Sequence, residues 1–136
     1  MDESKVLKIA EELAVAICNT LPEPSFLACD YIFTEVVRKA ASEGNSWAKQ
    51  WTTYNGPGRP HCPDFRNGLR MLQTAGSGYW ESPTYRYFRV TLSARRVAEN
   101  PVTDEAKAVA KAFCVAVGEL PLSPSSPPEN QDSPKT

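Results

Sequence analysis

The amino-acid sequence predicts an α+β domain, in which a helical hairpin and two further helices surround a short antiparallel β-hairpin. Three observations lead to this class. Apolar residues recur every three or four positions in residues 2–20, 25–44 and 103–117, as they do along one side of an α-helix. Side chains alternate between apolar and polar in residues 85–92, as in a strand with one buried face. Residues 121–136 are rich in proline and serine, so we expect one globular domain over residues 1–120 and a flexible tail over 121–136.

The first two helices are predicted to form an antiparallel hairpin. The apolar stripe of residues 2–20 consists of Val6, Ile9, Ala10, Leu13, Ala14 and Ile17. Pro22 and Pro24 then break the chain. A second helix is expected to begin at Ser25 as its N-cap and to end at Gly44, because glycine tolerates the left-handed backbone that often follows a helix.

The middle of the chain is predicted to hold two shorter helices around an irregular loop. Trp47, Trp51 and Tyr54 are spaced four and three apart, so a short helix would place their rings on one side. Residues 55–63 read NGPGRPHCP, which excludes regular structure. A helix from Asp64 to Gly76 follows, and it carries three residues inward and two arginines outward: Phe65, Leu69 and Leu72 against Arg66 and Arg70.

The β-hairpin is predicted from the stretch YWESPTYRYFRV at residues 79–90. Its second strand would turn Phe88, Val90 and Leu92 to the core, and Tyr85, Tyr87 and Arg89 to the other face. Tyr79 and Trp80 would form the partner strand. The last helix follows, with Thr103 as its N-cap.

Charge is unevenly distributed along the chain, although the net charge is only −1. Residues 1–48 carry a net charge of −4, residues 49–96 carry +6, and residues 97–136 carry −3. A local excess of arginine says more about partners than the average does. Function is therefore expected in the middle segment.

Cysteine usage and the N-terminus predict a cytoplasmic protein. The four cysteines contain no CxxC pair, and three of them, Cys18, Cys29 and Cys114, fall on apolar faces of predicted helices. The acidic start MDE is unlike a signal peptide, and no stretch approaches the roughly 18 apolar residues that a spanning helix needs. We therefore expect no membrane partner.

Catalytic and metal chemistry find little support in the sequence. His61 and Cys62 are adjacent, and a thiolate beside an imidazole can act as a nucleophile, but neighbouring side chains usually point apart. One histidine and four scattered cysteines lack the paired spacing of a zinc site. The glycines of residues 56–58 lack the GK[ST] ending of a phosphate loop. We expect no cofactor and no enzyme activity.

Nucleic-acid binding is the alternative function that the sequence suggests. Arginines interleaved with tyrosine and tryptophan can pair with phosphates and stack on bases, and the candidates are Arg66, Arg70, Arg95 and Arg96. A helix followed by a two-stranded ribbon is similar, in a general way, to the winged-helix class of DNA binders. Against this, a helix-turn-helix needs about three or four residues between its helices, and residues 55–63 are a longer loop.

Protein recognition is the function that we expect. Trp, Tyr and Arg are enriched at the centres of interfaces because they combine a large buried area with a polar tip. The predicted partner-binding residues are Trp51, Trp80, Tyr85, Arg86, Tyr87 and Arg89. The sequence thus predicts a small regulatory or adaptor protein, which would bind a partner such as a transcription regulator, or form a homodimer, and so modulate the partner's assembly.

Overall fold

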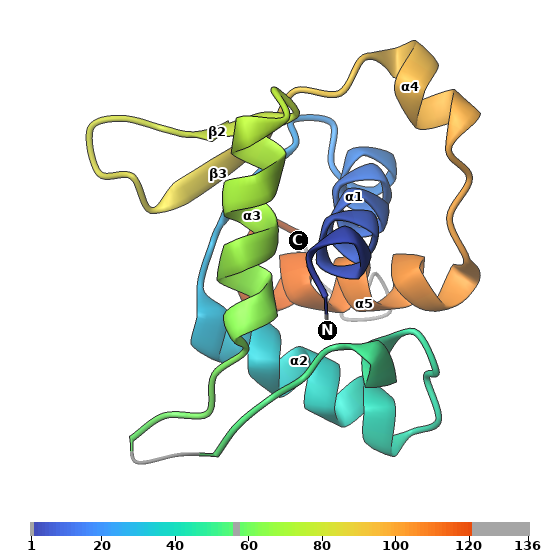
Figure 1. Ribbon diagram of the computed structural model, residues 1–136, viewed down its shortest axis with the longest axis vertical. Coiled ribbons are helices and arrows are strands. Elements are labelled where there is room, and N and C mark those ends of the chain that lie inside the picture. The colour runs from blue at the N-terminus through green and yellow to red at the C-terminus, as the bar shows by residue number, and fades with distance from the viewer. Residues whose placement is uncertain (1, 56–57, 121–136) are drawn as a thin grey trace, which may run out of the picture.

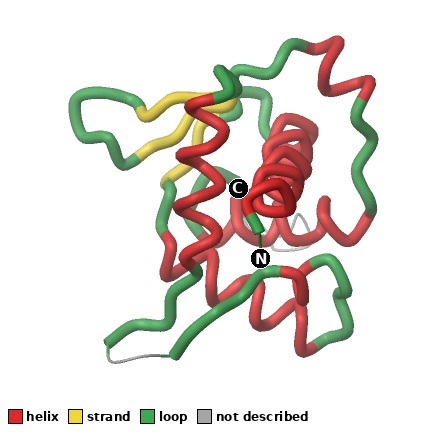
Figure 2. Tube along the Cα trace, viewed as in Figure 1, coloured by secondary structure: helices red, strands yellow, loops and turns green. Residues whose placement is uncertain are grey.

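The computed structural model describes residues 2–55 and 58–120 of the 136-residue chain. The α+β class is confirmed. The described residues form five α-helices, one 3-10 helix and three short strands, shown in Figures 1 and 2. In chain order these are α1 (Glu3–Thr20), β1 (Ser25–Leu27), α2 (Asp30–Ser42), η1 (Ala48–Gln50), α3 (Pro63–Thr74), β2 (Gly78–Trp80), β3 (Tyr87–Val90), α4 (Ala94–Glu99) and α5 (Asp104–Ala116). The predicted tail, 121–136, lies outside the described residues.

Helix α1 is the centre of the helical part. The carboxylate of Asp2 caps it by accepting a hydrogen bond from the backbone N–H of Lys5, as expected of an N-cap aspartate. All six residues of its predicted apolar stripe are buried. Helix α1 packs mainly against α5 and α3, and Figure 1 shows it between α3 and α4. In the described part of the chain, no helix is long and apolar enough to cross a membrane.

The segment after α1 differs from the predicted second helix. Ser25–Leu27 form strand β1, and α2 begins only at Asp30. Strand β1 separates α1 from α2 in the chain, and α2 packs mainly on α5, so the two N-terminal helices are not neighbours in a hairpin. The end of the helix agrees with expectation, because Gly44 has a φ of +97° just after it.

The three strands form one antiparallel sheet in the order β1-β3-β2. The predicted hairpin of β2 and β3 is therefore present, and β1 adds a third strand. In the register, Phe88 of β3 lies between Phe26 of β1 and Trp80 of β2. Gly78 is required beside this row, because a Cβ at that position would lie 2.4 Å from the ring of Phe88. Figure 2 shows the strands together at one side of the molecule.

The core beneath the sheet is built from phenylalanine rings on five different elements. Phe33 of α2 stacks on Phe65 of α3 with ring centroids 4.3 Å apart, and it meets Phe113 of α5 edge-on at 5.3 Å. Phe26 contacts Phe113 at 5.6 Å and Phe88 at 6.1 Å. Stacked and edge-to-face contacts of this kind add stability beyond the buried area itself. The sheet is thereby fixed on the helices.

The remaining helices confirm some sequence predictions and add one element. Helix α3 buries the three predicted inward residues, and α5 begins as predicted, since the Thr103 side chain accepts a hydrogen bond from the N–H of Ala106. Helix α4 was not predicted. It is capped by Ser93, buries none of its residues, and connects the sheet to α5 around the far side of α1 (Figure 1).

Candidate functional site

The outer surface of the sheet is the first candidate site. We call it the outer sheet face, and it consists of Ser25, Leu27, Tyr79, Glu81, Tyr87 and Arg89. The register places Arg89 between Ser25 and Tyr79, while Tyr87 lies opposite Leu27. Tyr79 is 46% exposed and Tyr87 is 39% exposed, so two large rings of this face are open to solvent. The opposite face carries Phe26, Phe88 and Val90, which are buried.

A polar network links side chains across the outer sheet face. Arg89 Nε donates to Glu81 Oε2 at 3.1 Å, and Arg89 also donates to Glu23 Oε2 at 3.3 Å. The Ser25 hydroxyl donates to the other oxygen of Glu81, which connects β1 to the residue that follows β2. The Ser25 hydroxyl first, and Arg89 second, lower the pKa of the Glu81 carboxyl. Arg89 is therefore a positioning residue of this face, held between two carboxylates.

The strand alternation on which the predicted surface depends is confirmed. Phe88 and Val90 are buried, and Tyr87 and Arg89 lie on the opposite side. Tyr85, which was expected inside the strand, lies just before it at the hairpin turn and is 62% exposed. Its φ of +56° is unusual for a tyrosine, and strained backbone of this kind is common at binding sites. Arg86 follows it and is also exposed.

Two of the predicted partner-binding residues lie elsewhere. Trp51 is only 4% exposed, and its ring meets Phe33 at 4.8 Å, so it belongs to the core and is no surface anchor in the folded monomer. The reason is that Trp47 and Trp51 flank the short helix η1, and both rings point into the core, with centroids 5.7 Å apart. Trp80 is half-buried on the inner side of the sheet, 5.4 Å from the ring of Phe88. It is not on the same face as Tyr87.

The four arginines of the nucleic-acid alternative fall into two separate places. Arg66 and Arg70 are exposed on α3, as predicted. Arg95 and Arg96 are on α4, on the other side of α1 (Figure 1), where Arg95 pairs with Glu99 at 2.9 Å and Arg96 with Glu11 at 3.8 Å. One continuous surface of all four arginines is therefore not formed.

The adjacent His61 and Cys62 are not arranged for nucleophilic chemistry. Cys62 is fully buried, and this burial raises the pKa of its thiol to about 12, so the thiol stays protonated near neutral pH. The His61 ring stacks on Tyr54, with centroids 5.5 Å apart. Within residues 2–55 and 58–120, no three His, Cys, Asp or Glu side chains gather as a metal site would require.

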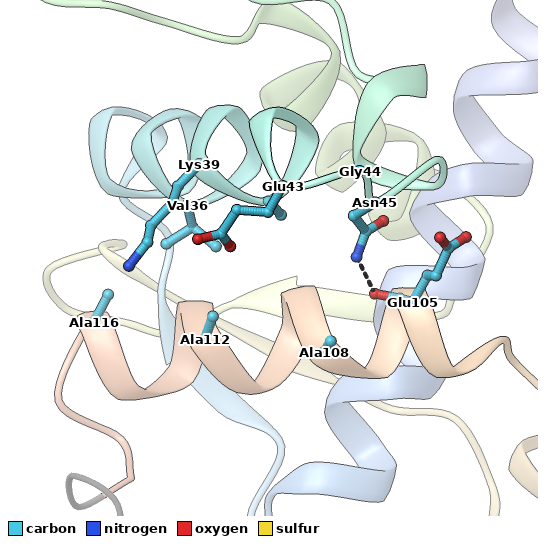
Figure 3. A pocket seen from close by; sticks show the side chains of 10 residues that line it. Val36, Lys39, Glu43, Gly44, Asn45, Glu105, Ala108, Ala112 and Ala116 are labelled. Carbon is cyan, nitrogen blue, oxygen red and sulfur yellow. Dashed lines mark hydrogen bonds between the residues drawn. The ribbon is translucent and has the colours of Figure 1, made fainter.

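A groove of about 600 Å³ lies between α2 and α5, as Figure 3 shows. Its floor is a row of three alanines one helical turn apart, Ala108, Ala112 and Ala116, and Lys39 and Glu43 stand above it. One end is closed by Asn45, whose side-chain amide donates to the backbone carbonyl of Glu105 at 3.0 Å. The groove offers little chemistry beyond a shallow apolar floor.

Sequence reasoning missed the part of the outer sheet face that β1 contributes. Ser25 and Leu27 were assigned to a helix, and the signal that could have corrected this is Asp30, an acidic residue suited to a helix's first turn. Comparisons of the chain with protein-family models, with curated proteins and with solved structures find no match. Function must therefore be argued from the residues alone.

Proposed function

We propose that this protein is a small, non-catalytic regulatory or adaptor protein, which docks on a protein partner through its outer sheet face and the adjacent hairpin turn. The observation that carries the proposal is the group of exposed tyrosines formed by Tyr79 and Tyr87 on the outer sheet face and Tyr85 at the adjacent hairpin turn. Tyrosine loses little conformational freedom on binding and provides both apolar area and a hydroxyl group, which makes it a frequent interface anchor.

Preorganisation of the surface supports the same function. Arg89 lies opposite Tyr79 in the register and is already paired with Glu81 and Glu23 in the single chain. A preorganised surface loses less entropy on association, so more of the contact energy appears as affinity. Arg86 at the turn adds an exposed cation next to the tyrosines, and arginine is also enriched at interface centres.

The proposed location is the cytoplasm. All four cysteines are free thiols, and Cys62 and Cys114 are buried in the core. Unpaired buried thiols are typical of proteins from reducing compartments. The proposed partner is a protein, for example a transcription regulator whose assembly would be modulated, or a second copy of this chain.

The test is a pair of double variants. Tyr79→Ala with Tyr87→Ala removes two rings of the outer sheet face, and Tyr31→Ala with Tyr54→Ala removes two exposed rings elsewhere. A protein partner is identified by affinity capture from the host with the original chain, and its binding to each double variant is then compared. Self-association of each variant is measured by sedimentation.

The first pair should weaken association by about 30-fold or more, which corresponds to about 2 kcal/mol. The second pair should leave association within about threefold of the original, and neither pair should lower the melting temperature by more than a few degrees. Equal binding by the two double variants would refute the proposal.

A further inference from the structure

The exposed side of α3 carries two arginines that form no ion pair with the rest of the described protein. We call this surface the α3 face, and it consists of Arg66, Asn67, Arg70, Gln73 and Thr74. It contains no carboxylate. Among the residues that the structure describes, Arg66 and Arg70 take part in no ion pair, whereas Arg89, Arg95 and Arg96 all do. The α3 face is therefore suited to an anionic partner.

The shape of α3 fits the groove of a nucleic-acid duplex. The helix has 12 residues, which gives a length of about 18 Å at about 1.5 Å per residue. The major groove of B-DNA, about 12 Å wide, admits an α-helix. The opposite side of α3 is firmly seated, since Phe65, Leu69 and Leu72 are buried and Gly68 lies directly on Ala10 of α1. The α3 face is thus presented by a fixed helix.

The residue types of the α3 face are those that read base edges. Arginine can pair with guanine through two hydrogen bonds, and asparagine or glutamine can do so with adenine. Arg70 already donates to the Asn67 side chain at 3.2 Å, so these two side chains are held next to each other on the exposed ridge.

The β2–β3 hairpin lies beside α3 and adds a second contact region. The guanidinium of Arg66 lies 5.6 Å from the ring centroid of Trp80, which joins the helix to the hairpin by a cation–π contact. Figure 1 shows the hairpin projecting beyond α3, and Arg86 near its turn is exposed. One duplex could therefore contact the α3 face and the hairpin together.

The start of α3 is also fixed against the rest of the fold. A long connection separates α2 from α3 in the chain, but a hydrogen bond joins the two helices where it ends. The Asp30 carboxylate accepts it from the N–H of Cys62 at 2.8 Å. This bond holds the start of α3 at the start of α2.

We infer that the α3 face binds duplex DNA, with Asn67 and Arg70 at base edges in the major groove and with Arg66 and Arg86 on phosphates. The α3 face is a different surface from the outer sheet face, and Arg86 of the hairpin turn is the one residue that both proposals use. The two activities are therefore separable: the α3 face would place the protein on DNA, and the outer sheet face would hold its protein partner there.

The test uses the full chain and a fluorescent 30-base-pair duplex of random sequence, with binding followed by anisotropy from low to moderate salt. Arg66→Ala with Arg70→Ala should weaken binding at low salt by about tenfold or more, and each lost phosphate contact should reduce the slope of log K against log salt by about 1. The matched control is Arg95→Ala with Arg96→Ala, which removes two arginines of α4 and should leave binding within about twofold.

Three results would overturn the inference: absence of binding at low ionic strength, an equal loss in both double variants, or equal affinity for an RNA duplex, whose deep, narrow major groove does not admit a helix. Selection from a randomised duplex library should yield a preferred sequence, and Asn67→Ala should abolish that preference. Failure to select any sequence would contradict base reading. The Tyr79 and Tyr87 double variant should bind DNA normally, which separates this test from that of the proposed function.

Discussion

Replacing Gly68 of α3 with alanine tests how closely α3 lies against α1. A Cβ at position 68 would lie 2.8 Å from the Cβ of Ala10 and 3.8 Å from Cγ1 of Val6. Ala10 is buried and has no side-chain torsion that could move its methyl group away. The two helices would have to separate by about 0.6 Å to reach ordinary contact distance.

Two opposing effects set the change in the free energy of unfolding. Alanine favours a helix over glycine by about 1 kcal/mol in an exposed interior position. Overfilling a well-packed contact costs about 1–3 kcal/mol. Because both methyl groups are attached directly to backbone, we expect the clash to exceed the gain, and Gly68→Ala should lower stability by about 1 kcal/mol.

The assay is urea unfolding followed by circular dichroism. Gly68→Ala is measured both in the original chain and in a chain that carries Ala10→Gly. In the Ala10→Gly background the clash is removed, so Gly68→Ala should raise stability by up to about 1 kcal/mol. This reversal of sign is the expected signature. If Gly68→Ala instead stabilises the original chain by about 1 kcal/mol, α1 and α3 are not in close contact, and the seat proposed for the α3 face is wrong.

Three further predictions concern other parts of the fold. Thr103→Ala removes the cap of α5 and should lower the free energy of unfolding by about 1 kcal/mol, measured by urea titration, whereas Thr103→Ser should retain most of it. The Cys62 thiol should resist a thiol reagent at neutral pH in the folded state and react on unfolding, and rapid native modification would contradict its burial. Because the pKa of Glu81 is lowered, its ionised carboxylate stabilises the folded state fully above the ordinary pKa of about 4.5, and this contribution is lost as the pH falls. Glu81→Gln should therefore flatten the acidic part of the pH profile of the melting temperature. An unchanged profile would exclude the network around Glu81 as the source of this pH dependence.

Elements with a long local pattern could be predicted from the sequence. Helices α3 and α5 show their buried faces through apolar residues three and four positions apart. Thr103 marks the start of α5, because its side chain caps a backbone N–H only three residues further on. The alternation around Phe88 likewise gave the two faces of β3. In each case the determining contacts lie close together in the chain.

Elements that depend on distant partners could not be predicted. Ser25–Leu27 has three residues, too few for a period, and Phe26 continues the helical spacing of α2. Only its pairing with β3 makes this segment a strand. Helix α4 buries no residue, so it has no apolar pattern to detect. Trp51 is buried and Tyr87 is exposed, and tertiary contacts such as that of Trp51 with Phe33 decide this difference between two aromatic residues.

The central position of β3 also bears on how the chain matures during translation. Strand β1 pairs only with β3, and its partner residues leave the ribosome about 60 residues later. At common synthesis rates of about 5–20 residues per second, β1 is therefore unpaired for several seconds before β3 has been synthesised. Pro22, Pro24 and the brevity of β1 then serve as protection, because so short a strand beside prolines offers nascent chains little opportunity to aggregate.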